Sequence, residues 1–453
     1  MTLHTQPAEV REPARTVPVF GAYDVLVLGG GPAGLAAATA AARKGATVLL
    51  VERYGFLGGM GTAAGVTNFC GLHANVYGEI RQVVHGVADD LLARMRALDG
   101  LNAPHLVLGK IWAQAYDMSA LKCAADALLQ DAGVDLLFHA LGTGVTMRND
   151  GNIESLLLET RSGRVAVLAR VFIDCSGDAD LAHWSGVAYE KGTGAGEMMY
   201  PTLMFKVGNV DAAAAGDAWR TIPEKMKETA GNYRFPRHGA IVRPMKNDYE
   251  WRVNVTQLAA ADGSALDGTD AKALSAGEVE GRRQAVDYLR FLREQIPGFA
   301  NAYLLDIPPQ LGIRETRRVV CETMLTGENV LGCARFEDSI GVNGWPLEKH
   351  VAGNVVWEWP AIPESCGYNQ LPYRMLLPRR TAGASLANLL VAGRCAGMTH
   401  DGQSAARVSG ACFVMGEAAG TAAALALGGN GSVYDVEPVT LQQALTGQRV
   451  FLG

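Results

Sequence analysis

The chain of 453 residues is long enough for two or three lobes, and its 49% hydrophobic and 19% charged residues are typical of a soluble globular protein. Its net charge of −6, without a lysine-rich run, excludes nucleic acid and an anionic membrane as the main partner. The eight cysteines include no CxxC pair, which excludes the usual spacing of zinc sites and redox disulfides. Because free cysteines favour a reducing compartment, we expect a cytoplasmic protein.

The first predicted elements are a polar arm and a βαβ unit. Residues 1–20 contain three prolines and no apolar signal core, which predicts a flexible arm. A strand is predicted over 23–28, an alanine-rich helix over 35–44 and a second strand over 46–51. The apolar stretch 25–51 is interrupted by glycines and carries two basic residues, so we predict no membrane span.

The loop between the first strand and the helix has the pattern GxGxxG. Gly29 permits a tight turn, Gly31 lets the backbone approach a pyrophosphate, and Gly34 lets the helix pack closely on the sheet. Glu52 ends the second strand, where a carboxylate can accept hydrogen bonds from ribose hydroxyls. The unit therefore predicts a dinucleotide site formed by Gly29, Gly31, Pro32, Ala33, Gly34 and Glu52.

The middle of the chain changes character twice. Between about 190 and 300, strand-like pieces alternate with polar loops, which predicts an inserted, mostly β substrate domain. Within it, 275–295 is typical of an amphipathic helix that Ser275 and Glu278 would start as a capping box. The segment 330–375 is rich in Gly, Pro and Trp without periodicity, which indicates functional loops. Before these segments, helices are predicted over 80–98 and 118–133, and strands over 134–140, 145–147, 153–159 and 165–173.

Three further segments favour FAD over NAD. A second glycine cluster, 55–62, directly follows Glu52 and Arg53. The apolar strand ending at 173 runs into Ser-Gly-Asp, and a strand over 389–392 leads through glycine to a long helix predicted over 405–427. No second GxGxxG between a strand and a helix occurs, so we expect no separate NAD(P)H domain.

These motifs resemble the FAD-dependent oxidoreductase family of the glutathione-reductase superfamily, related in its flavin domain to fumarate reductase and succinate dehydrogenase. The resemblance covers 23–190 and returns over about 310–427. It implies that the late helix directs its N-terminus at the flavin pyrimidine, where negative charge collects on reduction. It adds these residues to the predicted FAD site: Arg53, Gly58, Gly59, Met60, Thr62, Gly177, Asp178, Gly393, Arg394, Ser404, Arg407 and Val408.

We therefore predict an α/β fold, with a Rossmann-type FAD-binding domain like that of glutathione reductase and an inserted, mostly β substrate domain. The predicted segments are a flexible arm (1–20), the first part of the FAD-binding domain (21–190), the substrate insert (191–300), a domain junction (301–335), active-site loops (336–375), the last part of the FAD-binding domain (376–430) and a C-terminal tail (431–453).

Two histidines and two arginines are the candidate catalytic residues. His350 and His400 lie in loops where the family pattern carries a histidine, and imidazole suits proton transfer because its pKa lies near neutrality. Arg314 and Arg374 also resemble family segments, and a guanidinium can bind a carboxylate through two parallel hydrogen bonds. The alternative for the arginines is an internal Arg–Glu network at a domain junction.

Aromatic and nucleophilic residues add two open questions. Trp345, Trp357 and Trp359 are expected to be packing residues, with an aromatic wall over the flavin as the alternative. Cys70 and His73 follow the second glycine cluster, and in related flavoproteins a residue nearby bonds covalently to the flavin. Ordinary packing or cavity lining is the favoured interpretation for both.

The predicted activity is hydride transfer between a small organic substrate, with a carboxylate as one possibility, and flavin N5. The alternatives are a flavin-dependent monooxygenase and a non-catalytic FAD-binding protein. Oxygen, a quinone or another protein remains open as the electron acceptor, and so does a homo-oligomeric state. No metal site is predicted.

Overall fold

The computed structural model describes residues 12–237, 239, 241–380 and 386–453. The predicted βαβ unit is confirmed: β1 (Val19–Leu28), α1 (Pro32–Arg43) and β2 (Val48–Val51) follow one another, and β1 pairs with β2 in parallel. β1 begins earlier than predicted because residues 19–22 also pair with β11 (Gly163–Asp174).

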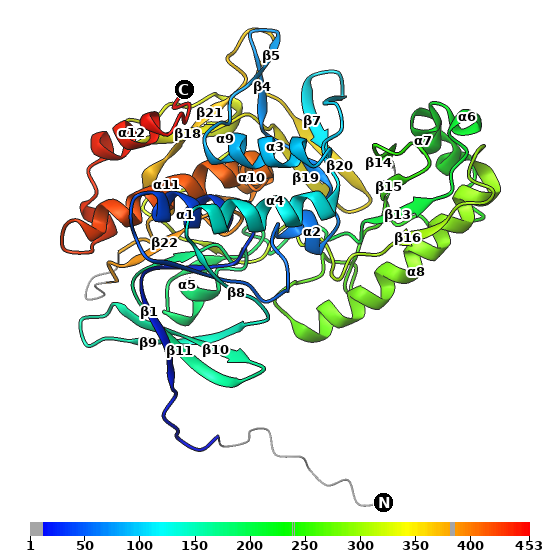
Figure 1. The fold of residues 1–453 in the computed structure, drawn as a ribbon. Helices are drawn as coiled ribbons and strands as arrows, with labels where there is room; N and C mark the ends of the chain where they lie inside the picture. The colour runs from blue at the N-terminus through cyan, green and yellow to red at the C-terminus, as the bar shows by residue number, and fades with distance from the viewer. Residues whose placement is uncertain (1–11, 238, 240, 381–385) are drawn as a thin grey trace, which may run out of the picture.

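A seven-stranded sheet forms the centre of what we call the sheet unit, residues 12–190 and 386–453 (Figure 1). Its strand order is β8-β2-β1-β11-β10-β9, and β22 also pairs with β11. All pairs are parallel except those that join β9, β10 and β11, so the carboxyl ends of β1, β11 and β22 meet at one edge. In open parallel sheets, ligands bind at this edge. The remaining strands are β8 (Asp135–Leu137), β9 (Leu141–Met147), β10 (Ile153–Thr160) and β22 (Leu389–Val391).

Helix α11 (Ser409–Leu427) packs along α1 at very short range. A Cβ atom on Gly416 or Gly420 would lie only 2.0 Å from the carbonyl oxygen of Ala33 or Ala37, respectively. Glycine at these two positions, four residues apart, therefore lets the two backbones touch. Helices α3 (Val87–Ala97) and α4 (Met118–Asp131) complete the layer over the sheet.

Two predicted helices were wrong in extent. Residues 79–82 form a strand, β5, paired with β4 (His73–Val76), and α3 begins only after Gly86, whose φ of 70° is not helical. The helix predicted over 405–427 is two helices, because Val408 is extended with ψ of 163° and separates α10 (His400–Ala406) from α11.

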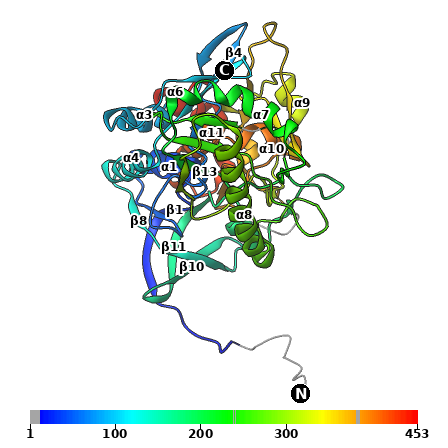
Figure 2. The same ribbon diagram turned by 90° about the vertical axis from the view of Figure 1, so that its right-hand side faces the viewer.

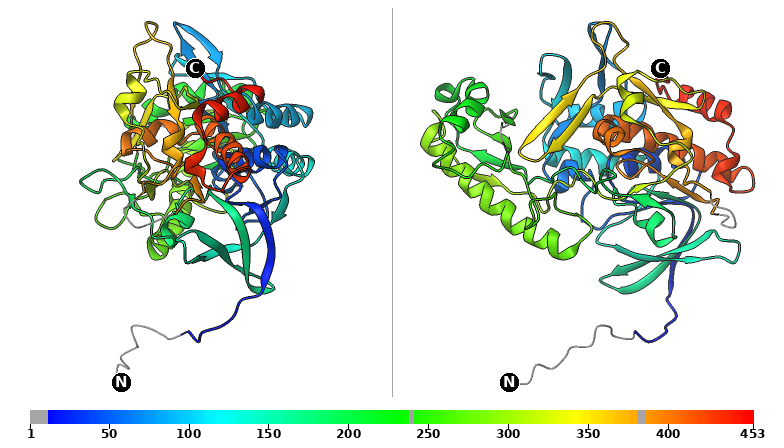
Figure 3. Two further views of the ribbon diagram at one scale, coloured as in Figure 1. Left: turned by 90° about the vertical axis from the view of Figure 1, so that its left-hand side faces the viewer. Right: turned by 180° about the vertical axis from the view of Figure 1, so that it is seen from behind.

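The inserted region forms a second unit with its own core, which runs from Leu203 to Ile313 and which we call the insert unit. Its antiparallel sheet has the order β14-β15-β13-β16, and Figures 1 and 2 show α6, α7 and α8 around it. In Figure 3, this unit and α12 lie at opposite ends of the molecule. The elements are β13 (Phe205–Gly208), α6 (Ala212–Ala215), α7 (Ala218–Glu228), β14 (Ile241–Pro244), β15 (Trp251–Asn254), α8 (Ala271–Gln295) and β16 (Tyr303–Asp306).

The start of α8 differs from the predicted capping box. Asp270 is the N-cap and accepts a hydrogen bond from the Ala273 N–H, one turn before the predicted start. Ser275 donates to the Ala271 carbonyl, and Glu278 accepts from the Leu311 N–H. Aspartate at an N-cap satisfies the free N–H groups as well as serine does, so the helix extends back to it.

The segment predicted as aperiodic loops contains four strands. β18 (Ser339–Asn343) pairs with β21 (Asn369–Pro372), and β19 (Leu347–Val351) pairs with β20 (Asn354–Glu358). The remaining elements are α2 (Met60–Ala63), β3 (Asn68–Phe69), β6 (His105–Val107), β7 (Ile111–Ala115), α5 (Asp180–Trp184), β12 (Tyr189–Glu190), β17 (Arg318–Val319), α9 (Gly327–Leu331), α12 (Pro438–Gly447) and the 3-10 helices Tyr373–Leu376 and Val433–Asp435.

Among the described residues, α11 is the one helix long and apolar enough to cross a membrane. Of its most apolar window, 83% is buried inside the fold, mostly against α1 and the sheet. Such burial is the placement of a core helix, and length and composition alone are weak evidence for a span.

Candidate active site

One cavity of about 810 Å³ lies between the carboxyl edge of the large sheet and the insert unit. Its walls include the glycine loop after β1, the second glycine cluster, residues 393–394 and both strands β14 and β15. Its volume is within the range of about 300–1,000 Å³ that is usual for small-molecule sites.

The two glycine clusters lie against each other at the sheet edge. The Gly58 N–H donates to the Gly30 carbonyl at 2.8 Å, and a Cβ atom on Gly59 would lie 2.7 Å from the Gly31 Cα. Gly59 has φ of 56° and ψ of −134°, a conformation that strongly favours glycine. Above Gly31, a Cβ would meet just one described heavy atom within 4 Å, the Gly59 Cα at 3.6 Å.

Helix α1 starts at this open space. Its N-cap is Gly31, which provides no side-chain cap. The N–H groups of the first turn and the positive end of the helix dipole are therefore free to face the cavity. This arrangement fits a pyrophosphate. Pro32 and Ala33 also line the cavity.

Gly29 and Gly34 serve packing. A Cβ on Gly34 would lie 1.8 Å from the Gly29 carbonyl oxygen, and a Cβ on Gly29 would lie 2.5 Å from that of Cys175. Close contact of α1 with the sheet therefore depends on both glycines.

Glu52 holds the glycine loop through hydrogen bonds to the backbone. Its carboxylate accepts hydrogen bonds from the N–H groups of Gly30, at 2.8 Å, and Tyr54, at 3.0 Å, and the side chain lines the cavity. Arg53 also lines the cavity and donates to the Gln310 side chain at 3.0 Å. A carboxylate with remaining acceptor capacity at this place fits a ribose hydroxyl.

A cluster of polar side chains lies at the carboxyl ends of β11 and β22. Arg394 lines the cavity, and its Nη2 donates to Asp178 at 2.9 Å. Asp178 also accepts from the Thr316 hydroxyl at 2.8 Å and lies behind the cavity wall. Gly177 leaves room for the guanidinium, because a Cβ there would lie 2.8 Å from its Nη2. The Arg394 charge is thus already compensated within the chain.

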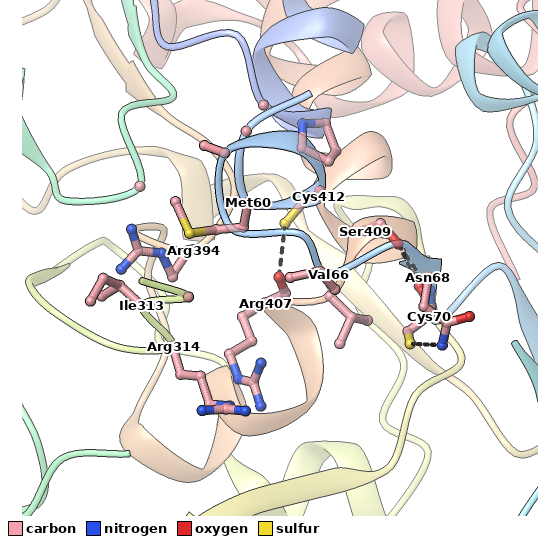
Figure 4. A pocket seen from close by; sticks show the side chains of 18 of the residues that line it. Met60, Val66, Asn68, Cys70, Ile313, Arg314, Arg394, Arg407, Ser409 and Cys412 are labelled. Carbon is pink, nitrogen blue, oxygen red and sulfur yellow. Dashed lines mark hydrogen bonds between the residues drawn. The ribbon is translucent and has the colours of Figure 1, made fainter. Parts of the chain in front are cut away.

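Helix α11, and not the predicted helix from residue 405, begins at the cavity. Val408 is its N-cap and has no side-chain cap, and the Ser409 hydroxyl donates to the Cys70 carbonyl at 3.1 Å (Figure 4). Met60, Gly393, Arg407 and Val408 line the cavity. Ser404 and Thr62 do not, since their hydroxyls donate to the carbonyls of Asp401 and Leu57.

His350 and Glu348 form a buried pair on β19 that faces the same cavity. The His350 Nε2 lies 3.2 Å from one carboxylate oxygen of Glu348, and the Trp345 indole N–H donates to the other at 3.0 Å. The Arg407 guanidinium also lies 4.0 Å from Glu348. Every member of this group lines the cavity.

The charges around this pair fix its protonation. Burial lowers the pKa of His350 well below its usual value, and the positive charge of Arg314 acts in the same direction. Burial alone would raise the pKa of Glu348, but the hydrogen bonds with His350 and Trp345 and the charge of Arg407 outweigh it and lower the pKa. At neutral pH, a neutral imidazole therefore faces an ionised carboxylate.

Arg314 lies next to this pair without a carboxylate of its own. Its Nη1 donates to the Tyr200 carbonyl at 2.5 Å, and no described carboxylate lies within 4.0 Å of its guanidinium. Burial and the charges of Arg407 and Arg237 lower the pKa of Arg314. Figure 4 shows the guanidinium groups of Arg314 and Arg407 in the lower part of the cavity. The surroundings disfavour this positive charge and would favour an anion beside it.

The sequence of the chain matches the family described as FAD dependent oxidoreductase over residues 24–445. The chain belongs to this family. It is therefore an oxidoreductase that uses FAD, and the glycine clusters, Glu52 and the α11 N-terminus are the parts of the cavity that fit this cofactor. The narrower relation to fumarate reductase and succinate dehydrogenase stays a resemblance.

Three solved structures illustrate what the fold is similar to. A geranylgeranyl bacteriochlorophyll reductase-like protein from Thermoplasma acidophilum is 15% identical, with 95% of this chain and 84% of that chain covered and a TM-score of 0.46. OxyS anhydrotetracycline hydroxylase from Streptomyces rimosus is 14% identical (94% and 66% covered, TM-score 0.44). The p-nitrophenol 4-monooxygenase PnpA from Pseudomonas putida is 12% identical (95% and 85%, TM-score 0.45). Comparison with curated protein sequences finds no match.

Two predicted catalytic residues lie outside the cavity of this flavoenzyme. His400 Nδ1 lies 2.9 Å from Glu315, a fully buried carboxylate that also accepts from the Gly192 and Met199 N–H groups. Arg374 is half exposed and pairs with Asp338 at 3.0 Å. Both side chains thus hold loops together, and we withdraw them as groups that contact the substrate.

The two candidates for covalent flavin attachment are separated by the fold. Cys70 lines the cavity, whereas His73 packs edge-on against Trp112 outside it. Burial raises the pKa of the Cys70 thiol to about 12, so this group stays protonated and is a poor nucleophile.

Of the three tryptophans, two line the cavity and one lies behind its wall. Trp345 and Trp357 line the cavity, with ring centroids 5.9 Å apart, while Trp359 stacks on Trp357 from behind.

The insert unit contributes arginines that were not predicted from the sequence. Arg237, Arg243 and Arg252 line the same cavity as the glycine clusters. Glu348 was also missed as a partner of His350, although alternation along β19 could have placed both side chains on one face. Arg243 and Arg252 face each other through the register of β14 and β15, which was not predicted, and Arg237 precedes β14.

Proposed function

We propose that this FAD-dependent oxidoreductase transfers a hydride between a small, carboxylate-bearing organic substrate and the cofactor, with His350 as the proton-transfer group. One observation supports this most: the His350–Glu348 pair and the unpaired Arg314 line the same cavity as the glycine clusters. A base and an anion-binding group thus share one space with the cofactor site.

FAD supplies the two-electron chemistry when bound. Arg314 binds the substrate carboxylate and orients the carbon that changes oxidation state. His350, kept neutral by burial and by Arg314, takes up the proton that leaves the substrate, or returns it in the reductive direction. Glu348 orients the imidazole and stabilises it once it is charged. Trp345 and Trp357 exclude water from this part of the cavity.

The test is anaerobic mixing of the holoenzyme with a panel of hydroxy, amino and unsaturated carboxylic acids, followed by the flavin absorbance. We expect bleaching with one class of acid, and His350→Gln should slow it about 10²–10⁴-fold while FAD content is unchanged. His85→Gln is the matched control, since His85 lies outside the cavity and pairs with Asp89. Reoxidation with oxygen and with a soluble quinone then compares two acceptors.

Two results would contradict the proposal. Bleaching at the wild-type rate in His350→Gln would remove this histidine from proton transfer. Incorporation of an oxygen atom into the substrate would favour a monooxygenase instead. A cytoplasmic location stays a prediction.

A further inference from the structure

The strongest unexplained feature of the cavity is a pair of arginines on the insert unit. Arg243 on β14 and Arg252 on β15 are directly opposite each other in the antiparallel ladder, and both line the cavity. Directly opposed like charges destabilise a strand pair. Among the described residues, no carboxylate lies within 4.0 Å of either guanidinium.

The contacts of Arg252 leave its positive charge uncompensated. The residue is 8% exposed, its Nη2 lies 3.3 Å from the His105 Nε2, and its buried Nε has no hydrogen-bond partner. Burial and the charges of Arg252 and Arg243 lower the pKa of His105 to about 4, so this imidazole is neutral at pH 7. His105 therefore accepts from Arg252 and adds no charge of its own.

Arg243 is held in place by an aromatic ring. Its guanidinium carbon lies 4.2 Å from the centroid of Trp219, and that of Arg220 lies 4.7 Å from the same centroid. All three side chains line the cavity, but Arg220 is exposed and has Asp217 at 3.5 Å. A cation on an aromatic face is ordered without being neutralised. On β14 and β15, two fixed positive charges without a carboxylate thus remain, those of Arg243 and Arg252. A further arginine of the insert unit, Arg237, donates to Asn254 at 3.1 Å and acts on Arg314 and Glu348 instead.

We propose that Arg243 and Arg252 bind a phosphate monoester group of the substrate, where β14 and β15 line the cavity. A carboxylate carries one negative charge and would leave one guanidinium uncompensated. A phosphate monoester carries about −1.5 to −2 at pH 7 and offers three acceptor oxygens, which match two guanidiniums. The pyrophosphate of FAD has its own site at the glycine loop and α1, on the sheet unit.

This inference rests on the proposed function for its interpretation of the ligand as substrate, and it narrows that substrate to an organic acid that also carries a phosphate monoester. Its test needs no turnover. The holoenzyme, with FAD in place, is titrated calorimetrically with inorganic phosphate and, separately, with acetate at the same ionic strength.

We expect one phosphate per chain and much weaker binding of acetate. Arg252→Gln and Arg243→Gln should each weaken phosphate binding about tenfold or more. Arg283→Gln is the matched control, because Arg283 is a mostly exposed arginine of α8 outside the cavity. Because Arg243→Gln also removes the repulsion between the strands, its Tm without phosphate should equal or exceed that of the wild type, and phosphate should no longer raise it.

Three results would overturn the proposal. Unchanged phosphate binding in both variants would remove the arginines from the site. Loss of FAD in step with loss of phosphate binding would assign them to the cofactor. Binding of two acetates as tightly as one phosphate would point to a dicarboxylate. None of these depends on His350, so a failure of hydride transfer would leave the phosphate result standing.

Discussion

The two ends of the cavity bind by different means. At the sheet edge, backbone N–H groups and glycines without side chains form the walls, and Arg394 already has Asp178 as its partner. On the insert unit, the walls are long side chains, and Arg243 and Arg252 have no carboxylate. A cofactor that stays bound suits a rigid backbone site with compensated charges, whereas a substrate that must leave suits charges that are incomplete without it.

The sharpest way to break this comparison is a side chain at the sheet edge. Gly59→Val places a Cβ 2.7 Å from the Gly31 Cα and forces a β-branched residue to φ of 56°. We expect the purified protein to lose FAD almost completely, measured as visible absorbance per chain.

The control for that experiment is Gly447→Ala, since a Cβ at Gly447 meets no described heavy atom within 4 Å and the residue has no positive φ. Normal FAD content in Gly59→Val would mean that the backbone of the second glycine cluster does not hold the cofactor.

At the substrate end, Arg314→Met should raise KM for the carboxylate substrate about ten- to hundredfold, because a charge-assisted hydrogen bond is lost. The same change removes the positive charge that lowers the pKa of His350. In the wild type, kcat/KM should fall on acidification only below about pH 6.5, the usual histidine range, and in Arg314→Met this fall should move to higher pH.

A pH–rate profile of both proteins checks this. If the fall of kcat/KM in acid occurred at the same pH in both proteins and KM were unchanged, Arg314 would neither bind the substrate nor shift the pKa of His350.

The fold and the cofactor end could be predicted from sequence because their signals are local. Gly29, Gly31 and Gly34 lie within six residues of one another, and a turn of chain fixes what they do. The substrate end could not, since Arg314 comes near Arg237 and Arg407 only in the folded chain, and the facing of Arg243 and Arg252 depends on the register of β14 and β15. His400 shows the converse error: its neighbourhood in sequence suggested the flavin, but its side chain turns to the buried Glu315.

A substitution of Glu417 tests whether the buried charges of the sheet unit are all compensated by their polar contacts. This buried carboxylate on α11 accepts the Val87 N–H at the start of α3, and burial raises its pKa to about 7. Since the pKa is higher in the folded than in the unfolded state, stability should decrease as pH rises from about 4.5 to about 7.

Glu417→Gln removes this titration. The stability of this variant relative to the wild type should therefore increase between pH 5 and pH 8, by about one to a few kcal/mol in the free energy of unfolding. Tm measured for both proteins at the two pH values checks this. A Tm difference that is the same at both pH values would show that Glu417 does not change its ionisation in this range.

The smallest expected effect is at Cys70. Because its thiol stays protonated, denaturation in acid and detergent should release all FAD, and Cys70→Ser should keep wild-type FAD content. A fluorescent yellow band on a denaturing gel that disappears in Cys70→Ser would instead establish a covalent bond.

The late position of β22 and α11 has a consequence for how the protein is made. Strand β11 exposes an unpaired edge until β22, more than 200 residues later in the chain, reaches it, and α1 lacks its partner helix for the same time. During synthesis, which proceeds at about 5–20 residues per second, the ribosome therefore releases six of the seven strands before it releases β22 and the helix that covers α1. Chaperones that shield strand edges are expected to matter more for this enzyme than for one whose sheet is contiguous in sequence.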